Sequence, residues 1–231
     1  MFGEGARNRV LAIVAALDEE EGIGLTIAEL RKYVEDPWIL VVDGKSRDRT
    51  VEVAKSLDVD VVVQRGKGKG DAIAQVIEEV NVANAQYVIL TDADYTYPAE
   101  YVPRMIEILD KNPKVGMVCG NRFNAHFDLE NMYNMFYFGN RLLAFTHNLL
   151  NGIELRDPLT GLRAIRSEIL KSWTPRSKGF DIEVELNHRV ERCGFGIREI
   201  PIYYRPRLGE KKLKLKDGAT ILKRIVLETM A

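Results

Sequence analysis

Two aspartates, Asp92 and Asp94, have the type and spacing that metal chemistry requires, because they follow directly on the apolar run Val88-Ile89-Leu90. Side chains at positions i and i+2 of a strand point to the same side, so the two carboxylates are expected to be neighbours. Like charges this close oppose each other's ionisation, and a divalent cation with oxygen ligands removes that penalty. The pair therefore predicts a Mg²⁺ or Mn²⁺ site. The alternative is that Asp92 caps the next helix and Asp94 is solvated.

Two further loops carry groups that suit a nucleotide. Asp43 ends an apolar run and precedes Gly44, so its carboxylate either accepts bonds from a nucleoside or orders its own Asp-Gly turn. The segment Arg65-Gly66-Lys67-Gly68-Lys69-Gly70 enters a helix, where backbone N–H groups and lysines receive phosphate charge. The chain lacks the Walker A spacing, and no Gly-x-Gly-x-x-Gly follows the first strand. These absences disfavour a nucleoside triphosphatase and a dinucleotide oxidoreductase.

The elements that must position these loops alternate between strands and helices in the first half. Apolar runs predict strands at residues 10–17, 38–42, 59–63, 87–91 and 115–119, and helical spacing predicts helices at 23–34, 50–57, 71–80 and 99–109. Such alternation gives right-handed βαβ units and an α/β fold with a mostly parallel central sheet flanked by helices. Ligands then bind beyond the carboxyl ends of the strands, where the loops above lie.

The second half is less regular. Its pattern predicts helices at 131–150, 182–192 and 219–229, a strand pair or one bent strand at 197–204, and a basic loop at 206–217. The helix at 131–150 is unusually apolar and contains the aromatic run Phe136-Tyr137-Phe138.

Composition describes a globular chain. The 231 residues are 46% hydrophobic and 29% charged, which supports a buried core and excludes a disordered chain. The net charge of -1 gives no support for a nucleic-acid partner. The first nine residues lack the apolar segment of a signal peptide, and no run of about 18 apolar residues suggests a membrane span.

Cysteines and histidines show no pattern of a metal or nucleophilic site. Cys119 and Cys193 are far apart in apolar settings and are expected to be reduced thiols. His126, His147 and His188 have neither ligand nor triad spacing and are expected to be ordinary polar or packing residues.

Six segments in order resemble the family 2 glycosyltransferases of the GT-A fold, and among them the polyprenyl-phosphate glycosyltransferases. They are Asp43-Gly44-x-Ser46-x-Asp48-x-Thr50, Asp92-Ala93-Asp94-x-x-x-Pro98, Gly120-Asn121-Arg122, Asp157-Pro158-Leu159-Thr160-Gly161-Leu162-Arg163, Lys178-Gly179-Phe180-x-x-Glu183 and Ile200-Pro201-Ile202 through Arg207-x-Gly209-x-Lys211-Lys212-Leu213. The resemblance spans about residues 10–213. It implies one Rossmann-like GT-A domain over 1–231, with a nucleotide-binding half (1–120), an acceptor-binding half (121–215) and a C-terminal amphipathic helix (216–231).

The resemblance also implies roles for single residues. Asp94 is expected to be the principal metal ligand, with Asp92 beside it near the nucleotide. The nucleotide sugar is expected at Leu17, Glu19, Asp43, Lys69 and Asp92, the acceptor phosphate at Arg141, Arg207 and Lys212, and catalysis at Asp94, Arg122 and Asp181. Two of these have alternatives, because Arg141 could snorkel over aromatics and Asp181 could cap a helix.

The chain departs from the family pattern near the nucleotide and the metal. The first strand ends in Ala15-Ala16-Leu17-Asp18-Glu19 instead of Pro-x-Tyr-Asn-Glu, and Thr96 stands where the mannose synthases have Gln. Lys211 stands where the family has Ser, one residue closer to Arg207. A water is expected to replace the missing amide ligand. The donor is a UDP-sugar or GDP-mannose, and these departures favour a UDP-sugar.

The implied reaction is inverting transfer of a hexose from a nucleoside-diphosphate sugar to dolichyl or another polyprenyl phosphate. A phosphate acceptor is already anionic at neutral pH and needs no general base. The apolar helix and the basic stretch 211–216 suggest docking to a membrane surface, peripherally at the cytoplasmic face, although the aromatics could instead be core. A soluble acceptor (a sugar or phosphoglycerate) and a catalytically inactive nucleotide-binding module are the alternatives.

Overall fold

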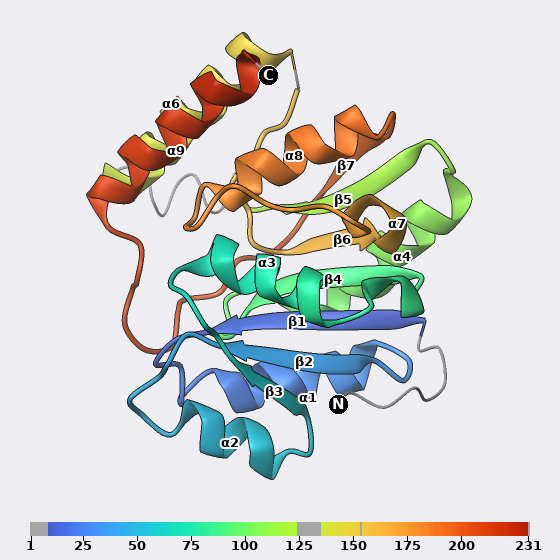
Figure 1. The fold of residues 1–231 in the computed structure, drawn as a ribbon, viewed down its shortest axis with the longest axis vertical. Helices are drawn as coiled ribbons and strands as arrows, with labels where there is room; N and C mark the ends of the chain where they lie inside the picture. The colour runs from blue at the N-terminus through green and yellow to red at the C-terminus, as the bar shows by residue number, and fades with distance from the viewer. Residues whose placement is uncertain (1–8, 124–134, 153, 231) are drawn as a thin grey trace.

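The fold is a seven-stranded mixed sheet with helices on both faces, given by a computed structural model that describes residues 9–123, 135–152 and 154–230 (Figure 1). The strand order is β3-β2-β1-β4-β6-β5-β7. The strands are β1 (Val10–Ala16), β2 (Trp38–Asp43), β3 (Asp60–Val63), β4 (Tyr87–Asp92), β5 (Val115–Asn121), β6 (Arg163–Arg166) and β7 (Gly196–Pro201). The predicted strands are confirmed, and those that pair with one another run in parallel, as expected.

Strand β6 is the element that the sequence did not predict. It pairs antiparallel with both β4 and β5 and so inserts between them. It is four residues long and begins and ends with arginine, so it lacks the apolar run that marks the other strands. Because β6 comes from the second half of the chain, the halves 1–120 and 121–215 share one sheet.

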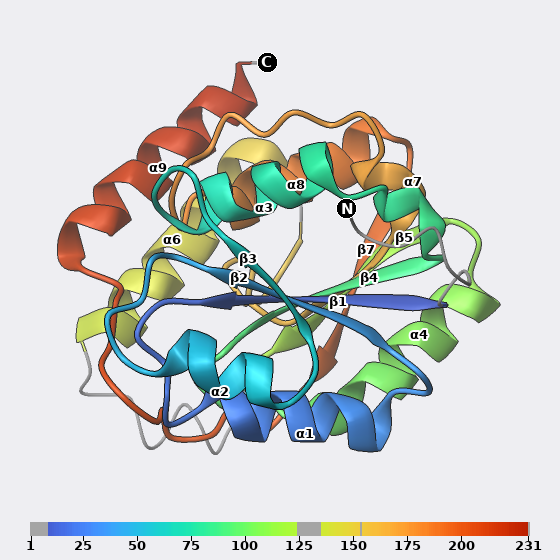
Figure 2. The same ribbon diagram turned by 60° about the horizontal axis from the view of Figure 1, so that its bottom comes forward.

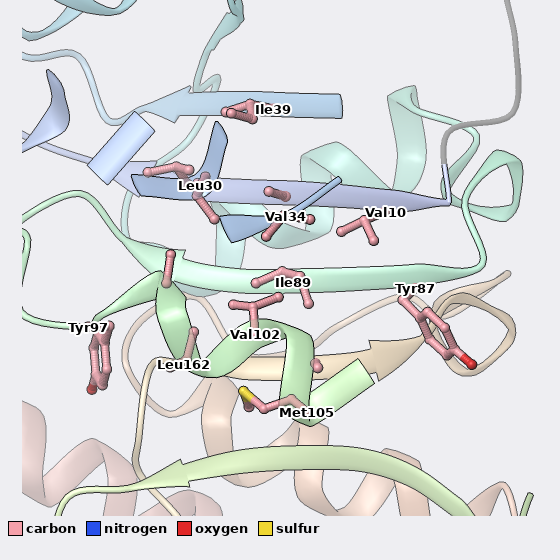
Figure 3. Packing of buried hydrophobic residues seen from close by; sticks show 14 of the residues in the cluster. Val10, Leu30, Val34, Ile39, Tyr87, Ile89, Tyr97, Val102, Met105 and Leu162 are labelled. Atoms are coloured by element: carbon pink, nitrogen blue, oxygen red, sulfur yellow. The ribbon is translucent and has the colours of Figure 1, made fainter. Parts of the chain in front are cut away.

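Helices cover the sheet in two layers (Figure 2). One face carries α1 (Ile23–Tyr33), α2 (Thr50–Ser56), the 3-10 turn η2 (Ala99–Tyr101) and α4 (Val102–Lys111), and the other carries α3 (Lys69–Glu79), η1 (Val82–Asn84), α7 (Ser167–Leu170) and α8 (Ile182–Arg192). Two apolar cores result. In the first, shown in Figure 3, Leu30 of α1 and Met105 of α4 pack towards Ile89 of β4.

The register of the sheet brings the acidic loops to one edge. Ala16 at the end of β1 lies opposite Asp43 of β2, and Ala15 lies opposite Asp92 of β4. Since all three strands are parallel, their carboxyl ends, and the loops after them, lie together. The expectation of one shared rim is therefore confirmed.

Two helices, α6 (Met135–Asn151) and α9 (Leu215–Thr229), lie side by side beyond the sheet, on the side to which β1 and β2 point (Figures 1 and 2). Ile221 and Ile225 of α9 pack with Val184 of α8, which fixes α9 to the main body. Residues 131–134 of the predicted apolar helix fall outside the described residues.

Candidate active site

A pocket of about 530 Å³ opens at the carboxyl ends of the strands. Its walls come from the loops after β4 and β5, from the segments before β6 and α8, from α3, α6, α8 and α9, and from the segment 203–213 after β7. It is lined by Lys69, Asp92, Asp94, Tyr97, Arg122, Tyr137, Asn140, Leu159, Gly161, Phe180, Glu183, Tyr203, Tyr204, Arg205, Pro206, Arg207, Lys211, Leu213 and Ile221. We call it the strand-end pocket.

Asp94 is buried at the pocket wall, and each of its two carboxylate oxygens contacts a neighbouring side chain. Oδ1 accepts bonds from the hydroxyl of Thr96 (2.6 Å) and from its backbone N–H (3.1 Å). Oδ2 lies 2.9 Å from Nη1 of Arg207. Burial, and secondly the charge of Asp92, raise the pKa of the Asp94 carboxyl, so a nearby cation would favour its charged form. Thr96 is fully buried. It therefore orients Asp94 and is not exposed to ligate a metal itself.

Asp92 is paired with Lys69 in the same pocket. The Lys69 ammonium lies 2.6 Å from Asp92 and 2.9 Å from Glu183, and its side chain is only 8% exposed. Burial opposes the charge of Lys69, but the two carboxylates outweigh it and raise its pKa. Glu183 was not singled out as a site residue. Its second oxygen is buried and has no hydrogen-bond partner among the described residues.

At the end of the glycine-rich loop, two backbone N–H groups are already occupied and do not receive phosphate charge as expected, and phosphate binding by the rest of the loop stays a prediction. The N–H groups of Gly70 and Asp71 donate to the carbonyls of Gly179 and Lys178 (3.1 and 3.2 Å). A Cβ on Gly70 would lie 2.3 Å from the Ser177 carbonyl oxygen. The glycines therefore allow close backbone contact with the segment 177–179, and only the Lys69 side chain reaches the pocket.

Glu19 and Lys212 lie beside the metal candidates. Glu19 forms an ion pair with Arg207, and its other oxygen is buried without a partner in the described part of the chain. Burial, partly offset by Arg207, raises the pKa of Glu19 to about 7. Lys212 donates to the Asp18 carbonyl (3.1 Å) and does not line the pocket.

Arg122 lies in the pocket and is held by Asp157, 35 positions later in the chain. Its guanidinium makes two 2.7 Å bonds to the Asp157 carboxylate, and its backbone N–H donates a third of 3.0 Å. It also stacks over the Tyr204 ring at 5.3 Å. Desolvation opposes the charge, but Asp157 outweighs it and raises the pKa of Arg122. The Asp-Pro motif of the sequence thus has a concrete task, which is to anchor this arginine.

Asp43 orders its own turn, one of the two roles that the sequence left open. Its carboxylate accepts bonds from the backbone N–H groups of Lys45 (2.9 Å) and Ser46 (3.1 Å), and it is almost fully buried. Leu17 is 40% exposed and lies against Gly44 of that turn. A nucleoside contact of Asp43 or Leu17 stays a prediction.

Asp181 and Arg141, like Leu17, Glu19, Asp43 and Lys212, lie outside the pocket lining. Asp181 bonds to the Gly179 N–H (3.1 Å) and to Nε of Arg224 on α9 (3.2 Å). It makes no side-chain cap to α8. The exposed Arg141 lies over the Phe123 ring at 5.3 Å, which is the snorkelling arrangement named as its alternative. Their roles towards an acceptor stay predictions.

The residues of the pocket fit a hard cation in part. Within the described ranges no group of three or more His, Cys, Asp or Glu side chains is arranged to hold a metal, so the protein offers the Asp92 and Asp94 pair. The raised pKa of the Asp94 carboxyl and the neighbouring pocket volume suit a cation that takes its other ligands from a diphosphate and water.

Several pocket residues were missed because their partners are distant in sequence. Tyr97 packs edge-on against Tyr204 at 5.1 Å and accepts a bond from the Gly161 N–H (2.8 Å). Arg205 pairs with Glu29, 176 positions earlier. No spacing pattern in a single sequence signals such pairs.

Comparison with known proteins finds one matching sequence family and several similar proteins. The family described as Glycosyl transferase family 2 matches residues 11–174. The dolichyl-phosphate hexose transferase of Haloferax volcanii is 33% identical over 218 residues, covering 93% of this chain and 91% of that protein. The undecaprenyl-phosphate mannosyltransferase of Micrococcus luteus is 28% identical over 219 residues, covering 89% and 87%.

Solved structures show the same architecture. A glucosyl-3-phosphoglycerate synthase from Mycobacterium tuberculosis, crystallised with Mn²⁺, UDP-glucose and phosphoglyceric acid, has a TM-score of 0.76 at 20% identity. The match covers 96% of this chain and 80% of that one. At this identity the likeness shows the fold alone, and it confirms the GT-A glycosyltransferase fold that the sequence resemblance implied.

Proposed function

The chain belongs to glycosyl transferase family 2, and from this membership we propose that it is a metal-dependent hexosyltransferase acting on a polyprenyl phosphate. One observation carries the proposal. The strand-end pocket combines an acidic pair, Asp92 and Asp94, with the cations Arg122, Arg207 and Lys211. The first set suits a cation and its nucleotide sugar, and the second suits an anionic acceptor.

The donor end of the pocket is formed by Asp94, Asp92 and Lys69. In the proposal, Asp94 and Asp92 hold Mg²⁺ or Mn²⁺. The bound cation would neutralise the charge that develops on the leaving diphosphate. Lys69, held between Asp92 and Glu183, adds a fixed positive charge at the same end. Glu19 is buried behind this end of the pocket and pairs with Arg207, which in turn pairs with Asp94.

The acceptor end of the pocket gathers positive charge. Arg122, Arg207 and Lys211 line the same pocket, and partial burial together with the charges of the two arginines lowers the pKa of Lys211. An acceptor phosphate relieves this repulsion and accepts charge-assisted hydrogen bonds from these side chains. Its oxygen attacks the anomeric carbon as the bond to the nucleoside diphosphate breaks, with inversion. The acceptor is already deprotonated at neutral pH, so no base is needed.

A lipid acceptor fits the helices at the pocket mouth. Tyr137 and Asn140 of α6 and Ile221 of α9 line the pocket. The same helices expose apolar residues, which we call the α6–α9 face: Phe138 (59% exposed), Leu142 (65%), Phe145 (64%), Leu149 (68%), Leu222 (43%) and Val226 (43%). Among the described helices none has the length and apolar character to cross a bilayer. We propose that this face rests on the membrane surface.

The function is tested by incubating the protein with Mn²⁺, a short polyprenyl phosphate and labelled UDP-glucose, UDP-N-acetylglucosamine or GDP-mannose. Lipid-extractable label with one donor is the expected result, and the panel identifies the sugar. No lipid product with any donor would overturn the proposal. Parallel incubation with phosphoglycerate tests the soluble acceptor, and product there alone would replace the lipid by that acceptor.

Membrane docking has its own test. Serine at Phe138, Leu142, Phe145 and Leu149 together is expected to abolish co-sedimentation with vesicles containing anionic lipid. Serine at Leu25 and Val63, which are 46% and 53% exposed on other parts of the molecule, is the matched control. Equal binding of both variants would contradict a role of the α6–α9 face.

A further inference from the structure

Glu29, in the helix α1, lies outside the strand-end pocket but is the centre of a bonded cluster beside it. Its carboxylate accepts hydrogen bonds from Nη1 and Nη2 of Arg205 (3.0 and 2.7 Å). It also accepts bonds from the Tyr95 hydroxyl and the Ala99 backbone N–H, both at 3.2 Å. Four donors from three separate residues thus meet on one carboxylate.

The Glu29–Arg205 pair has the geometry of a strong ion pair. The two side chains are 15% and 21% exposed, and the guanidinium bonds through two nitrogens. Arg205 also lies over the Tyr95 ring at 4.2 Å. Forked, partly desolvated and stacked arginine pairs hold their orientation far better than exposed single-bond pairs.

This pair holds one specific backbone segment in place. The Arg205 N–H donates to the Thr96 carbonyl (3.0 Å), and the Leu208 N–H donates to the Asp94 carbonyl (3.3 Å). The segment 205–208 therefore runs across the loop that carries Asp94. Arg207 lies between these two anchors, with Nη1 2.9 Å from the Asp94 carboxylate.

We propose that Glu29 is a positioning residue for the acceptor phosphate, acting through Arg205 on Arg207. The inference rests on the proposed function, in which Arg207 binds that phosphate. Glu29 holds the backbone on one side of Arg207, and the Leu208 bond holds the other. Loss of the Glu29 charge frees the segment and lets the guanidinium of Arg207 leave the orientation in which it meets the acceptor.

The test is the variant Glu29→Gln, which keeps the size of the side chain and removes its charge. Michaelis constants are measured separately for the polyprenyl phosphate and for the nucleotide sugar. We expect the acceptor KM to rise about tenfold, the worth of one charge-assisted hydrogen bond, while the donor KM stays within about twofold. Arg205→Lys, which keeps the charge and loses the fork, is expected to shift the acceptor KM in the same direction.

A control variant and a double variant separate a positioning role of Glu29 from a purely structural one. Glu35→Gln, the same change at an exposed acid just after α1, is expected to leave both constants unchanged. The acceptor KM of the double variant Glu29→Gln/Arg205→Lys is expected to be no higher than that of the more impaired single variant, because both changes break the same ion pair. A lower melting temperature with an unchanged acceptor KM would show a merely structural pair and overturn the inference.

Two further outcomes separate this inference from the proposed function. An equal rise of donor and acceptor KM would mean that the pair organises the Asp94 loop as a whole, which also overturns it. If the wild-type protein transfers no sugar to polyprenyl phosphate, the proposed function fails and the inference fails with it. Wild-type transfer with an unaffected Glu29→Gln variant would overturn the inference alone.

Discussion

At the scale of single residues, both oxygens of the Asp94 carboxylate are oriented by neighbouring side chains. Thr96 fixes Oδ1 of Asp94 and leaves Oδ2 towards the pocket, where Arg207 meets it. The sequence suggested that a water replaces the amide ligand that is missing at position 96. The structure gives Thr96 a different task, which is to hold the ligand that remains.

Thr96→Val tests this task. The change keeps the shape of the side chain and removes the bond to Asp94, so we expect Mn²⁺ affinity, measured by electron paramagnetic resonance, to fall about tenfold, as for other partners of metal ligands. Thr96→Ser retains the hydroxyl and is expected to bind nearly as the wild type does. Asp94→Asn, the reference for a lost ligand, is expected to bind least. Unchanged affinity in Thr96→Val would refute the orienting role.

Asp157→Asn tests the anchor of Arg122. The side chains of this pair are 1% and 11% exposed, so the change leaves a buried guanidinium without its counter-charge. We expect the free energy of unfolding in urea to fall by about 3–5 kcal/mol. Glu107→Gln breaks an exposed pair with Lys111, whose side chains are 57% and 70% exposed, and is expected to change little. Equal stability of both variants would show that the buried pair is dispensable.

At the scale of elements, the site depends on two segments that meet backbone to backbone. The loop before α3 docks on the segment 177–179 before α8, and this contact inserts Lys69 between Asp92 and Glu183. Two motifs that look independent in the sequence therefore form one unit. Glycine is needed at position 70 because a Cβ would lie 2.3 Å from the Ser177 carbonyl oxygen.

Gly70→Ala tests the contact between the start of α3 and the segment 177–179. The added methyl group must push the two segments apart, at a cost of about 1–3 kcal/mol, and carries Lys69 away from Asp92. We expect a lower melting temperature together with a higher donor KM. Gly218→Ala in α9 is the matched control, since no atom lies within 4 Å of its added Cβ. Alanine there should leave stability equal or raise it by up to about 1 kcal/mol. Similar behaviour of both variants would contradict the close docking.

At the scale of the whole molecule, α6 is joined to the body through a buried polar cluster. His147 of α6 is fully buried, and its ring lies 5.6 Å from that of His188 on α8. Asn187 lies between His147 and the buried Arg163 of β6. His147 and His188 are thus packing residues, as the sequence suggested, and they connect the proposed membrane helix to the catalytic core, whereas His126 lies outside the described residues.

The two histidines predict how stability depends on pH. Burial lowers the pKa of both His147 and His188 from 6.5 to about 4, so the folded state keeps them neutral where the unfolded state binds protons. The stability they contribute is complete above pH 6.5 and is lost as pH falls from about 6.5 to about 4, on the order of 3 kcal/mol for each histidine. Urea unfolding across this range measures the slope. His188→Gln should reduce it by about half, and an unchanged slope would contradict the assignment.

The sequence by itself determined the parts of this protein that depend on local pattern. Buried strands read as apolar runs, and an acid that ends such a run lies at the strand's carboxyl end. For that reason the pattern alone was enough to place Asp43, Asp92 and Asp94 on one rim of the sheet. The order of the family motifs indicated the fold and the transferase family for the same reason, because each motif is a short segment with its own geometry.

The tertiary structure alone decided which distant groups meet. Whether the amides of Gly70 and Asp71 are free depends on what packs against them, and carbonyls 107 to 109 positions later occupy them. Strand β6 is inserted because both of its neighbours need a partner, although its four residues have no strand pattern. Glu29 meets Arg205 only because α1 and the segment after β7 pack on the same loop. Such pairings follow from the packing of the whole chain, and local patterns do not encode them.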